Sequence, residues 1–271
     1  MRRAIHIVLA LTTITALSAW PVAARAPSIY LALGDSLAWG DGASIPTRTA
    51  YVPRLDGYFH GSSHAATTDL VNIAVRGENT GSFISGGQLA AALAAIGDLS
   101  TDVAVVTLSI GGNDLGDLLS VPPCNTDPTG APCQFAVYGA LVGVAGNFPV
   151  IVGSLQAALA ADPGDEKVFV ITYWNAFGGT GSAFEVPIDF ALLGSDLTID
   201  CAANQVDASR VGLNDLIACI GMALDAVVVD LYPVIGDNAL AYTHIAEGDF
   251  HPNDDGYALI AQAHRRADRA S

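Results

Sequence analysis

Lysine is almost absent from this chain, which has one lysine, Lys167, among 271 residues. Lys and Arg together number 11 against 27 Asp and Glu, so the formal net charge is −16. A surface this acidic repels phosphate groups, because binding to nucleic acids depends on neutralising the charge of their backbone. The same repulsion argues against charge-driven binding to an anionic membrane. We therefore expect neither nucleic acid nor an anionic membrane surface as a partner.

Charged residues of either sign are also few, at 14%, whereas hydrophobic residues reach 51%. This composition excludes a disordered chain and a coiled coil, both of which are rich in charge. It supplies ample apolar material for a packed core. The sequence has no internal repeat, low-complexity tract or linker, and we expect a single domain over residues 25–271.

The first 24 residues have the pattern of a secretory signal peptide. Two arginines are followed by an uncharged apolar stretch, Ala4–Trp20, and then by the small residues Val22-Ala23-Ala24. Signal peptidase reads small residues before its cut, so we expect cleavage after Ala24. The alternative is an uncleaved membrane anchor, but the apolar stretch is shorter than the ~20 residues that a spanning helix needs. The pattern predicts a secreted or periplasmic protein.

The chain lacks a Cys-x-x-Cys motif and has four cysteines, Cys124, Cys133, Cys201 and Cys219. A zinc site is the weaker interpretation, because neither closely paired cysteines nor nearby histidines support it. Four cysteines permit three disulfide pairings. We expect Cys124–Cys133 and Cys201–Cys219, each closed within its own irregular segment, since turn-forming residues separate the first two. Disulfides agree with export.

No charged residue occurs from Gln134 to Ala161, a run long enough to raise the question of a transmembrane helix. The residues Gly139, Gly143, Gly146, Asn147 and Pro149 interrupt this run. We therefore predict two packed helices of a soluble domain, the second over Asn147–Ala161, instead of a stable membrane span.

Apolar runs and helical stretches alternate along the rest of the chain. Five runs are nearly continuous in apolar character, as strands buried on both faces of a parallel sheet are: Ser28–Leu33, Asp69–Val75, Val103–Ser109, Lys167–Tyr173 and Ala226–Leu231. Helical patterns lie at Tyr51–His60, Gln88–Ile96, Asn147–Ala161, Ser209–Leu224 and Asp254–Asp268. The alternation predicts an α/β fold, a three-layer sandwich with a five-stranded parallel sheet.

Polar residues follow four of the predicted strands, and ligand sites in parallel sheets lie beyond the carboxyl ends of the strands. The four clusters are Gly34-Asp35-Ser36, Arg76-Gly77-Glu78-Asn79, Gly111-Gly112-Asn113-Asp114 and Asp249-Phe250-His251-Pro252-Asn253. We expect the topology to bring them together at one edge of the sheet.

These clusters contain the groups that an acyl-transfer site needs. A serine at the start of a helix presents its hydroxyl at the sheet edge, and a neutral histidine can accept the hydroxyl proton and return it to the leaving alcohol. The N–H groups of Ser36 and Gly77 and the side-chain amide of Asn113 can stabilise an oxyanion. Ser36 and His251 are therefore the candidate nucleophile and base, and no metal or other cofactor is expected.

Two other hydrolase classes lack support. An α/β-hydrolase needs its serine in G-x-S-x-G, and no such pentapeptide occurs. A metallophosphoesterase also uses Gly-Asp, Gly-Asn and Asp-x-His groups. In that class Asp-x-His comes first and a histidine follows Gly-Asn, whereas here the order is reversed and Asp114 follows.

The four motifs together resemble the sequence blocks of the SGNH, or GDSL-type, hydrolases. The matching blocks are Gly34-Asp35-Ser36-Leu37, Gly77, Gly112-Asn113-Asp114 and His251-Pro252-Asn253, and the resemblance extends from about Ile29 to Ala263. It implies a flavodoxin-like sheet and a secreted or periplasmic esterase, lipase or carbohydrate deacetylase. Taken position by position, it implies Ser36 as nucleophile and His251 as base. It also implies an oxyanion hole of the Ser36 N–H, the Gly77 N–H and the Asn113 amide.

Two positions depart from the pattern of that family. Arg76 stands where a small residue is usual, and Gly248 stands where the family has its acid, three residues before the histidine. Three acceptors then compete for the second nitrogen of His251: the Asp249 carboxylate, the Glu247 carboxylate and the Gly248 carbonyl, which would leave a Ser–His dyad. We expect Asp249, because a carboxylate stabilises an imidazolium and Asp249 is the nearest in sequence.

The sequence thus predicts a secreted serine esterase that cleaves lipid or short-chain acyl esters, or acetylated carbohydrates, through an acyl-Ser36 intermediate. The alternative is a non-catalytic ligand- or carbohydrate-binding protein on the same fold, against which the presence of both Ser36 and His251 argues. We expect the segments Pro122–Cys133 and Asn175–Cys219 to form the walls of the pocket.

Four further residues near these motifs have expected roles outside the reaction. We expect Asp35 to bond the backbone of the loop beside Ser36, and His244 to have a packing or surface role. Trp39 and Tyr51 either contact substrate or pack.

Overall fold

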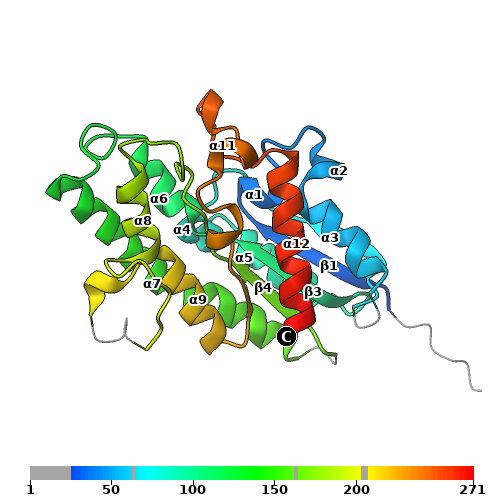
Figure 1. Cartoon of the computed structure of the whole chain (residues 1–271). Helices are drawn as coiled ribbons and strands as arrows, with labels where there is room; N and C mark the ends of the chain where they lie inside the picture. The colour runs from blue at the N-terminus through cyan, green and yellow to red at the C-terminus, as the bar shows by residue number, and fades with distance from the viewer. Residues whose placement is uncertain (1–25, 63–64, 162–163, 203–206) are drawn as a thin grey trace, which may run out of the picture.

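A parallel five-stranded sheet forms the centre of the computed structural model, which describes residues 26–62, 65–161, 164–202 and 207–271. The strands are β1 (Ser28–Gly34), β2 (Asp69–Asn72), β3 (Asp102–Ser109), β4 (Lys167–Ile171) and β5 (Val227–Val229). Their order across the sheet is β2-β1-β3-β4-β5, with every pair parallel (Figure 1). The predicted α/β fold is confirmed. The predicted signal peptide and its cleavage after Ala24 lie outside the described residues.

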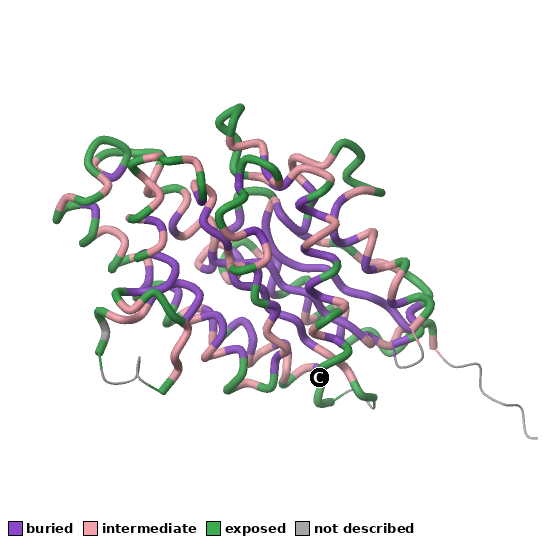
Figure 2. Tube along the Cα trace, viewed as in Figure 1, coloured by how far each residue is buried: buried purple, intermediate pink, exposed green. Residues whose placement is uncertain are grey.

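Helices cover both faces of the sheet. The side chains of β1 alternate between the two cores, with Tyr30 on one face and Leu31 on the other. The Tyr30 face is covered by α3 (Tyr51–His60) and α12 (Asp254–Ala270), and Figure 1 shows α12 crossing in front of the strands. The opposite face is covered by α4 (Thr80–Ser85), α5 (Gln88–Ile96), α7 (Ala131–Leu159) and α9 (Leu213–Ala223). All seven residues of β1 are buried, and Figure 2 shows the buried residues gathered along the strands.

The remaining helices are short and lie in the loops. They are α1 (Ser36–Trp39), α2 (Pro46–Thr49), α6 (Gly112–Leu119), α8 (Glu185–Leu193), α10 (Tyr232–Ile235) and α11 (Ala239–Tyr242), with two 3-10 turns, η1 (Ala208–Arg210) and η2 (Ile245–Glu247). Most of them follow the carboxyl ends of strands, the edge at which the polar motifs were expected.

The uncharged run forms one continuous helix, α7, and the prediction of two helices was wrong. Interior glycines cost about 1 kcal/mol each and Pro149 about 3 kcal/mol. Burial of large side chains such as Phe148, Ile151 and Leu155 offsets these costs, at roughly 1.5–3 kcal/mol for each side chain. The helix is therefore held by its packed face and not by its helix propensity.

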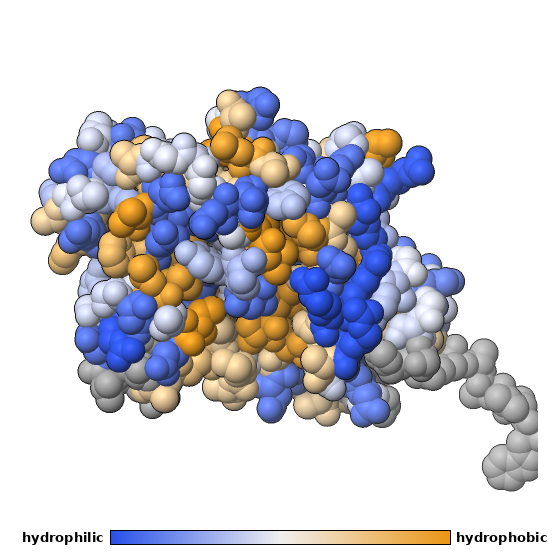
Figure 3. Space-filling model, viewed as in Figure 1, coloured by the Kyte–Doolittle hydropathy of each residue, from blue (hydrophilic) through white to orange (hydrophobic). Residues whose placement is uncertain are grey.

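Much of α7 remains exposed, including Phe135, Tyr138 and Val142. Among the described residues, α7 is the one helix long and apolar enough to cross a membrane, and 22% of its most apolar window is buried. Its other face packs on α4, α5 and α9, which ties it to the sheet. On the face viewed in Figure 3, hydrophobic side chains likewise reach the surface in patches between hydrophilic ones.

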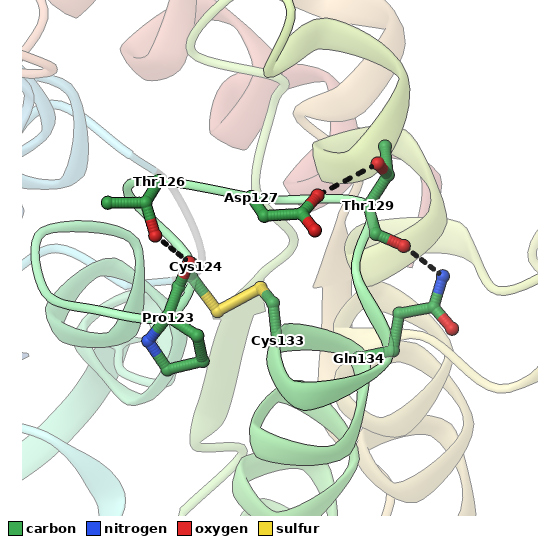
Figure 4. The surroundings of a disulfide bond; sticks show 7 residues. All are labelled: Pro123, Cys124, Thr126, Asp127, Thr129, Cys133 and Gln134. Carbon is green, nitrogen blue, oxygen red and sulfur yellow. Dashed lines mark hydrogen bonds between the residues drawn. A yellow bond between two sulfur atoms is a disulfide. The ribbon is translucent and has the colours of Figure 1, made fainter.

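Two disulfides close loops on the same side of the sheet as α7. One joins Cys124 to Cys133, at the start of α7, and the other joins Cys201 to Cys219, which lies in α9. In the first loop, Thr129 Oγ1 donates to Asp127 Oδ1 (3.2 Å) and Gln134 Nε2 donates to the Thr129 carbonyl (3.0 Å) (Figure 4). Each bond lies within its own segment, and disulfides of this kind are typical of an extracellular or periplasmic environment.

Candidate active site

Ser36 lies where β1 gives way to α1. Gly34 ends the strand with φ +128°, and a side chain there would collide with the Ser109 carbonyl of β3, so only glycine permits this turn. Asp35 then caps α1, since its Oδ1 accepts from the Leu37 N–H (2.9 Å). Ser36 is consequently the first residue of the helix, with its hydroxyl at the edge of the sheet.

His251 and Asp249 lie beside Ser36, although they are more than 200 residues away in sequence. His251 Nε2 is 2.8 Å from Ser36 Oγ, and His251 Nδ1 is 2.5 Å from Asp249 Oδ1. The three side chains form a continuous hydrogen-bonded chain from a hydroxyl through an imidazole to a carboxylate. Such a chain can carry a proton away from the serine and stabilise the imidazolium that results.

The local backbone explains why Asp249 reaches the ring. Gly248 ends η2 in the left-handed region with φ +83°, which turns the chain back toward His251. Asp249 Oδ1 also accepts from the His251 N–H at 3.0 Å, so a tight local turn holds the carboxylate against the residue it contacts. Glu247 lies elsewhere, with Oε2 3.9 Å from His244 Nδ1.

Partial burial raises the pKa of Asp249. The hydrogen bonds from His251 and the charges of His251 and His244 lower it by more, so the pKa lies below its ordinary value. The carboxylate is therefore charged at neutral pH. A charged acceptor on Nδ1 fixes the ring tautomer that leaves Nε2 free to take a proton from Ser36.

Asn113 faces the same site from the start of α6, and Gly77 lies in a neighbouring turn. Asn113 Nδ2 donates one hydrogen to the Glu78 carbonyl (2.8 Å), which leaves its second hydrogen for another acceptor. Gly77 is exposed, with φ +73°, in the turn after β2. The structure brings Ser36, His251 and Asn113 around one cavity, whereas Gly77 is not among the residues that line it.

This cavity has a volume of about 180 Å³ and is mostly apolar. Its apolar walls come from α6, the loop after β4, α8, α9 and the histidine loop: Leu115, Leu119, Trp174, Phe177, Ile188, Leu192, Leu213 and Phe250. Phe177 and Phe250 meet edge to face, with ring centroids 5.4 Å apart. A cavity of this kind fits a hydrocarbon group held next to the Ser36 hydroxyl.

One of the two predicted pocket walls is correct and the other is wrong. The segment Asn175–Cys219 lines the cavity through Phe177, α8 and Leu213. The segment Pro122–Cys133 does not line it. Pro128 and Thr129 lie instead on a separate groove between α7 and the far side of α8. The missing wall is supplied by α6, whose Leu115 and Leu119 lie one helical turn apart and follow directly from the Gly-Gly-Asn-Asp motif.

Asp35 is buried behind Ser36 and contacts three donors. Besides the Leu37 N–H, it accepts from Ser109 Oγ (3.2 Å) and Tyr173 Oη (3.2 Å). Burial raises the pKa of Asp35 to about 6, against the lowering effect of these hydrogen bonds. No sequence motif pointed to Tyr173, whose ring fills the space beside Gly112, where a Cβ would lie 2.7 Å from it.

The other residues singled out in the sequence lie around the site or in the core. Tyr51 is fully buried and stacks on Tyr257, so it packs and does not meet substrate. His244 Nε2 lies 2.9 Å from the Gly42 carbonyl. Trp39 is 47% exposed, with the Arg76 guanidinium 5.3 Å from its ring centroid.

In the parts of the chain that the structure describes, no three His, Cys, Asp or Glu side chains lie together as a metal site would need.

Comparison with known proteins gives a family and a shared fold. The profile of the GDSL-like Lipase/Acylhydrolase family matches residues 32–259. No curated protein matches the chain by sequence. Among solved structures, the chain is similar to the lipase Lip_vut3 from a goat rumen metagenome, with 18% identity and a TM-score of 0.60 over 88% of this chain and 96% of that one.

Two further structures are similar over most of their length. The acetylxylan esterase Axe2 from Geobacillus stearothermophilus has 13% identity and a TM-score of 0.57, covering 88% of this chain and 93% of that one. Phospholipase A1 from Streptomyces albidoflavus NA297 has 18% identity and a TM-score of 0.56, covering 90% and 100%. At such identities the likeness shows the fold and not the substrate.

Proposed function

The chain belongs to the GDSL-like Lipase/Acylhydrolase family, and we propose that it is a serine esterase that hydrolyses carboxylic esters with apolar acyl groups. The observation that carries this proposal is the 2.8 Å contact between His251 Nε2 and Ser36 Oγ at the mouth of an apolar cavity. The contact supplies a nucleophile with its base, and the cavity supplies a place for the acyl group beside them.

The reaction proceeds in two halves. His251 Nε2 takes the hydroxyl proton while Ser36 Oγ attacks the carbonyl carbon of the ester, and the resulting oxyanion accepts hydrogen bonds from the Ser36 N–H and the free hydrogen of Asn113 Nδ2. Gly77 N–H is the third donor that the family pattern implies. The intermediate collapses, and the protonated His251 gives its proton to the leaving alcohol. Water then attacks the acyl-Ser36 ester with His251 as base, which releases the acid and restores the hydroxyl.

Asp249 acts on His251 and not on the substrate. Its Oδ1 holds the Nδ1 proton and its charge stabilises the imidazolium in both halves of the reaction. Asp35, one residue before Ser36, bonds the loop backbone and takes no part in the proton transfers.

The lining of the cavity favours apolar acyl groups over acetylated sugars. Leucine, isoleucine and aromatic side chains offer few hydrogen bonds to a sugar ring, whereas each methylene that enters the cavity gains about 0.8 kcal/mol. The two disulfides and the predicted signal peptide support action outside the cytoplasm.

A series of p-nitrophenyl esters of increasing acyl length tests the proposal. We expect turnover with the wild-type protein, a fall on the order of 10⁴–10⁶ in Ser36→Ala, and no change on addition of a chelator. Ser120→Ala, at an exposed serine on the far end of α6, is the matched control and is expected to keep full activity.

Hydrolysis that persists in Ser36→Ala, or that disappears with the chelator, would exclude the serine mechanism. Binding of esters without any hydrolysis would favour the non-catalytic alternative.

A further inference from the structure

A tight turn after β2 carries Gly77. The Glu78 N–H donates to the Val75 carbonyl (3.2 Å), which closes a four-residue turn, and Gly77 occupies the position that needs a positive φ. Both ends of this turn are held, because the Val75 N–H donates to the Gly34 carbonyl (2.9 Å) and the Glu78 carbonyl accepts from Asn113 Nδ2 (2.8 Å). The two central residues, Arg76 and Gly77, are exposed.

Arg76 reaches from this turn to the segment that carries the nucleophile. Its Nη2 lies 2.5 Å from Asp41 Oδ1, and its guanidinium lies over the Trp39 ring, 5.3 Å from the centroid. Trp39 is the last residue of α1, and the Asp41 N–H donates to the Ser36 carbonyl (3.0 Å). One side chain thus joins the turn of Gly77 to the C-terminal end of the short helix that begins at Ser36, and the Asp41 N–H links that end to the Ser36 carbonyl.

We propose that Arg76 is a positioning residue that fixes the Gly77 N–H relative to Ser36. This inference rests on the proposed function, in which Gly77 is an oxyanion donor. The peptide N–H of Gly77 belongs to the bond that directly follows Arg76, so an anchor on the Arg76 side chain restrains the orientation of that N–H. Arg76, which departs from the family pattern, thereby has a role in positioning an oxyanion donor.

Stability does not explain these contacts. The Arg76 side chain is 61% exposed, and ion pairs of that kind contribute little to folding. Turnover is more sensitive to these contacts than stability is, because removal of one oxyanion donor lowers turnover by about 10²–10³. A partial loss of the alignment of that donor is therefore expected to lower turnover about tenfold.

The test compares kcat and KM of Arg76→Ala with those of Arg210→Ala, on p-nitrophenyl esters. Arg210 is the matched control, since its Nη2 lies 2.5 Å from Asp196 Oδ2 in another partly exposed pair away from Ser36. We expect kcat to fall about tenfold in Arg76→Ala with KM nearly unchanged, and neither constant to change in Arg210→Ala. Arg76→Lys, which keeps the charge, should restore part of kcat.

A double-mutant cycle shows whether Arg76 acts through Asp41. Asp41→Asn should lower kcat, and the combination with Arg76→Ala should be no worse than Arg76→Ala alone. Inactivation by a p-nitrophenyl alkylphosphonate, which also needs the oxyanion donors, should slow in parallel with kcat. If Arg76→Ala fails to fold, Arg76→Lys and Asp41→Asn carry the same test.

Two results would overturn the proposal: an unchanged kcat in Arg76→Ala, or a raised KM with kcat intact, which would make Arg76 and Trp39 a substrate contact. Ser36→Ala, measured alongside, separates this failure from the failure of the proposed function. An active Ser36→Ala enzyme refutes the serine mechanism whatever Arg76 does.

Discussion

Two carboxylates flank the proposed nucleophile and base, and their surroundings are opposite. Asp35 precedes Ser36 and is 3% exposed, whereas the side chain of Asp249, two residues before His251, is 48% exposed. Burial raises the pKa of Asp35 to about 6. Hydrogen bonds and charge from His251 more than offset the burial of Asp249 and lower its pKa.

The difference shows that nearness to a reactive residue in sequence does not assign a proton partner. The oxygens of Asp35 accept from the Leu37 N–H and from two hydroxyls, so this carboxyl braces the loop beneath Ser36. Asp249 lies against the ring of His251, which becomes charged in the proposed reaction. The exposed Asp249 stays ionised, so it is suited to stabilising a positive charge on His251. The buried Asp35 is suited to holding the loop beneath Ser36 in place.

Among changes to the acidic residues, loss of the Asp249 charge should give the largest effect. Asp249→Asn keeps the size of the side chain but can hold His251 in the wrong tautomer, so we expect turnover to fall on the order of 10³–10⁴, or roughly 4 to 5 kcal/mol on the barrier. Steady-state kinetics with a p-nitrophenyl ester measures this, and circular dichroism checks the fold. Turnover above about a tenth of the wild-type value would favour a Ser–His dyad instead.

Asp35 should affect stability in a way that depends on pH. Its pKa is about 6 in the folded protein and 3.8 as the ordinary value, so the unfolded chain ionises first as the pH rises. Folding therefore loses stability between about pH 4 and pH 6, by roughly 3 kcal/mol in total, and the loss is complete above that range. Asp35→Asn removes the ionisation and keeps a side chain that can cap α1.

Denaturant unfolding of both proteins at pH 4 and pH 7.5 measures this effect. We expect the free energy of unfolding of Asp35→Asn, relative to wild type, to rise by roughly 2 to 3 kcal/mol between the two pH values. A difference that does not change with pH would mean that Asp35 ionises as readily in the folded protein as in the unfolded chain. Turnover should fall less than in Asp249→Asn.

The sequence was sufficient for the sheet but not for the helix α7. The central strands β1, β3 and β4 are short runs of mostly apolar, mostly buried residues, a pattern with few other interpretations. In α7, Pro149 and the glycines are local signals for a break, and they were outweighed by burial of Phe148 and Ile151 against elements distant in sequence. Local propensity is a weak guide wherever tertiary packing opposes it.

The polar residues of the site were similarly easier to find than its walls. Ser36, Asn113 and His251 follow strand ends, so topology alone brings them together. The wall from α6 and the brace from Tyr173 depend on how helices pack over the sheet edge, which no local pattern encodes. Both disulfide-bearing segments were expected to form pocket walls. The segment Pro122–Cys133 does not, because α8 lies between it and the cavity.

Glu247 offers the smallest expected effect and the sharpest control for Asp249. It carries the same charge only two residues away, but its side chain is 70% exposed and its Oε2 lies 3.9 Å from His244 Nδ1 instead of His251. Exposed pairs of this kind are worth about 0–1 kcal/mol.

If the effect of Asp249→Asn came only from general negative charge near His251, Glu247→Gln would reproduce part of it. We expect instead that Glu247→Gln changes kcat/KM less than about twofold, because its charge is screened by solvent. A tenfold loss in Glu247→Gln, with the fold intact, would show that the loop responds to total charge and would remove the distinction between the two acids.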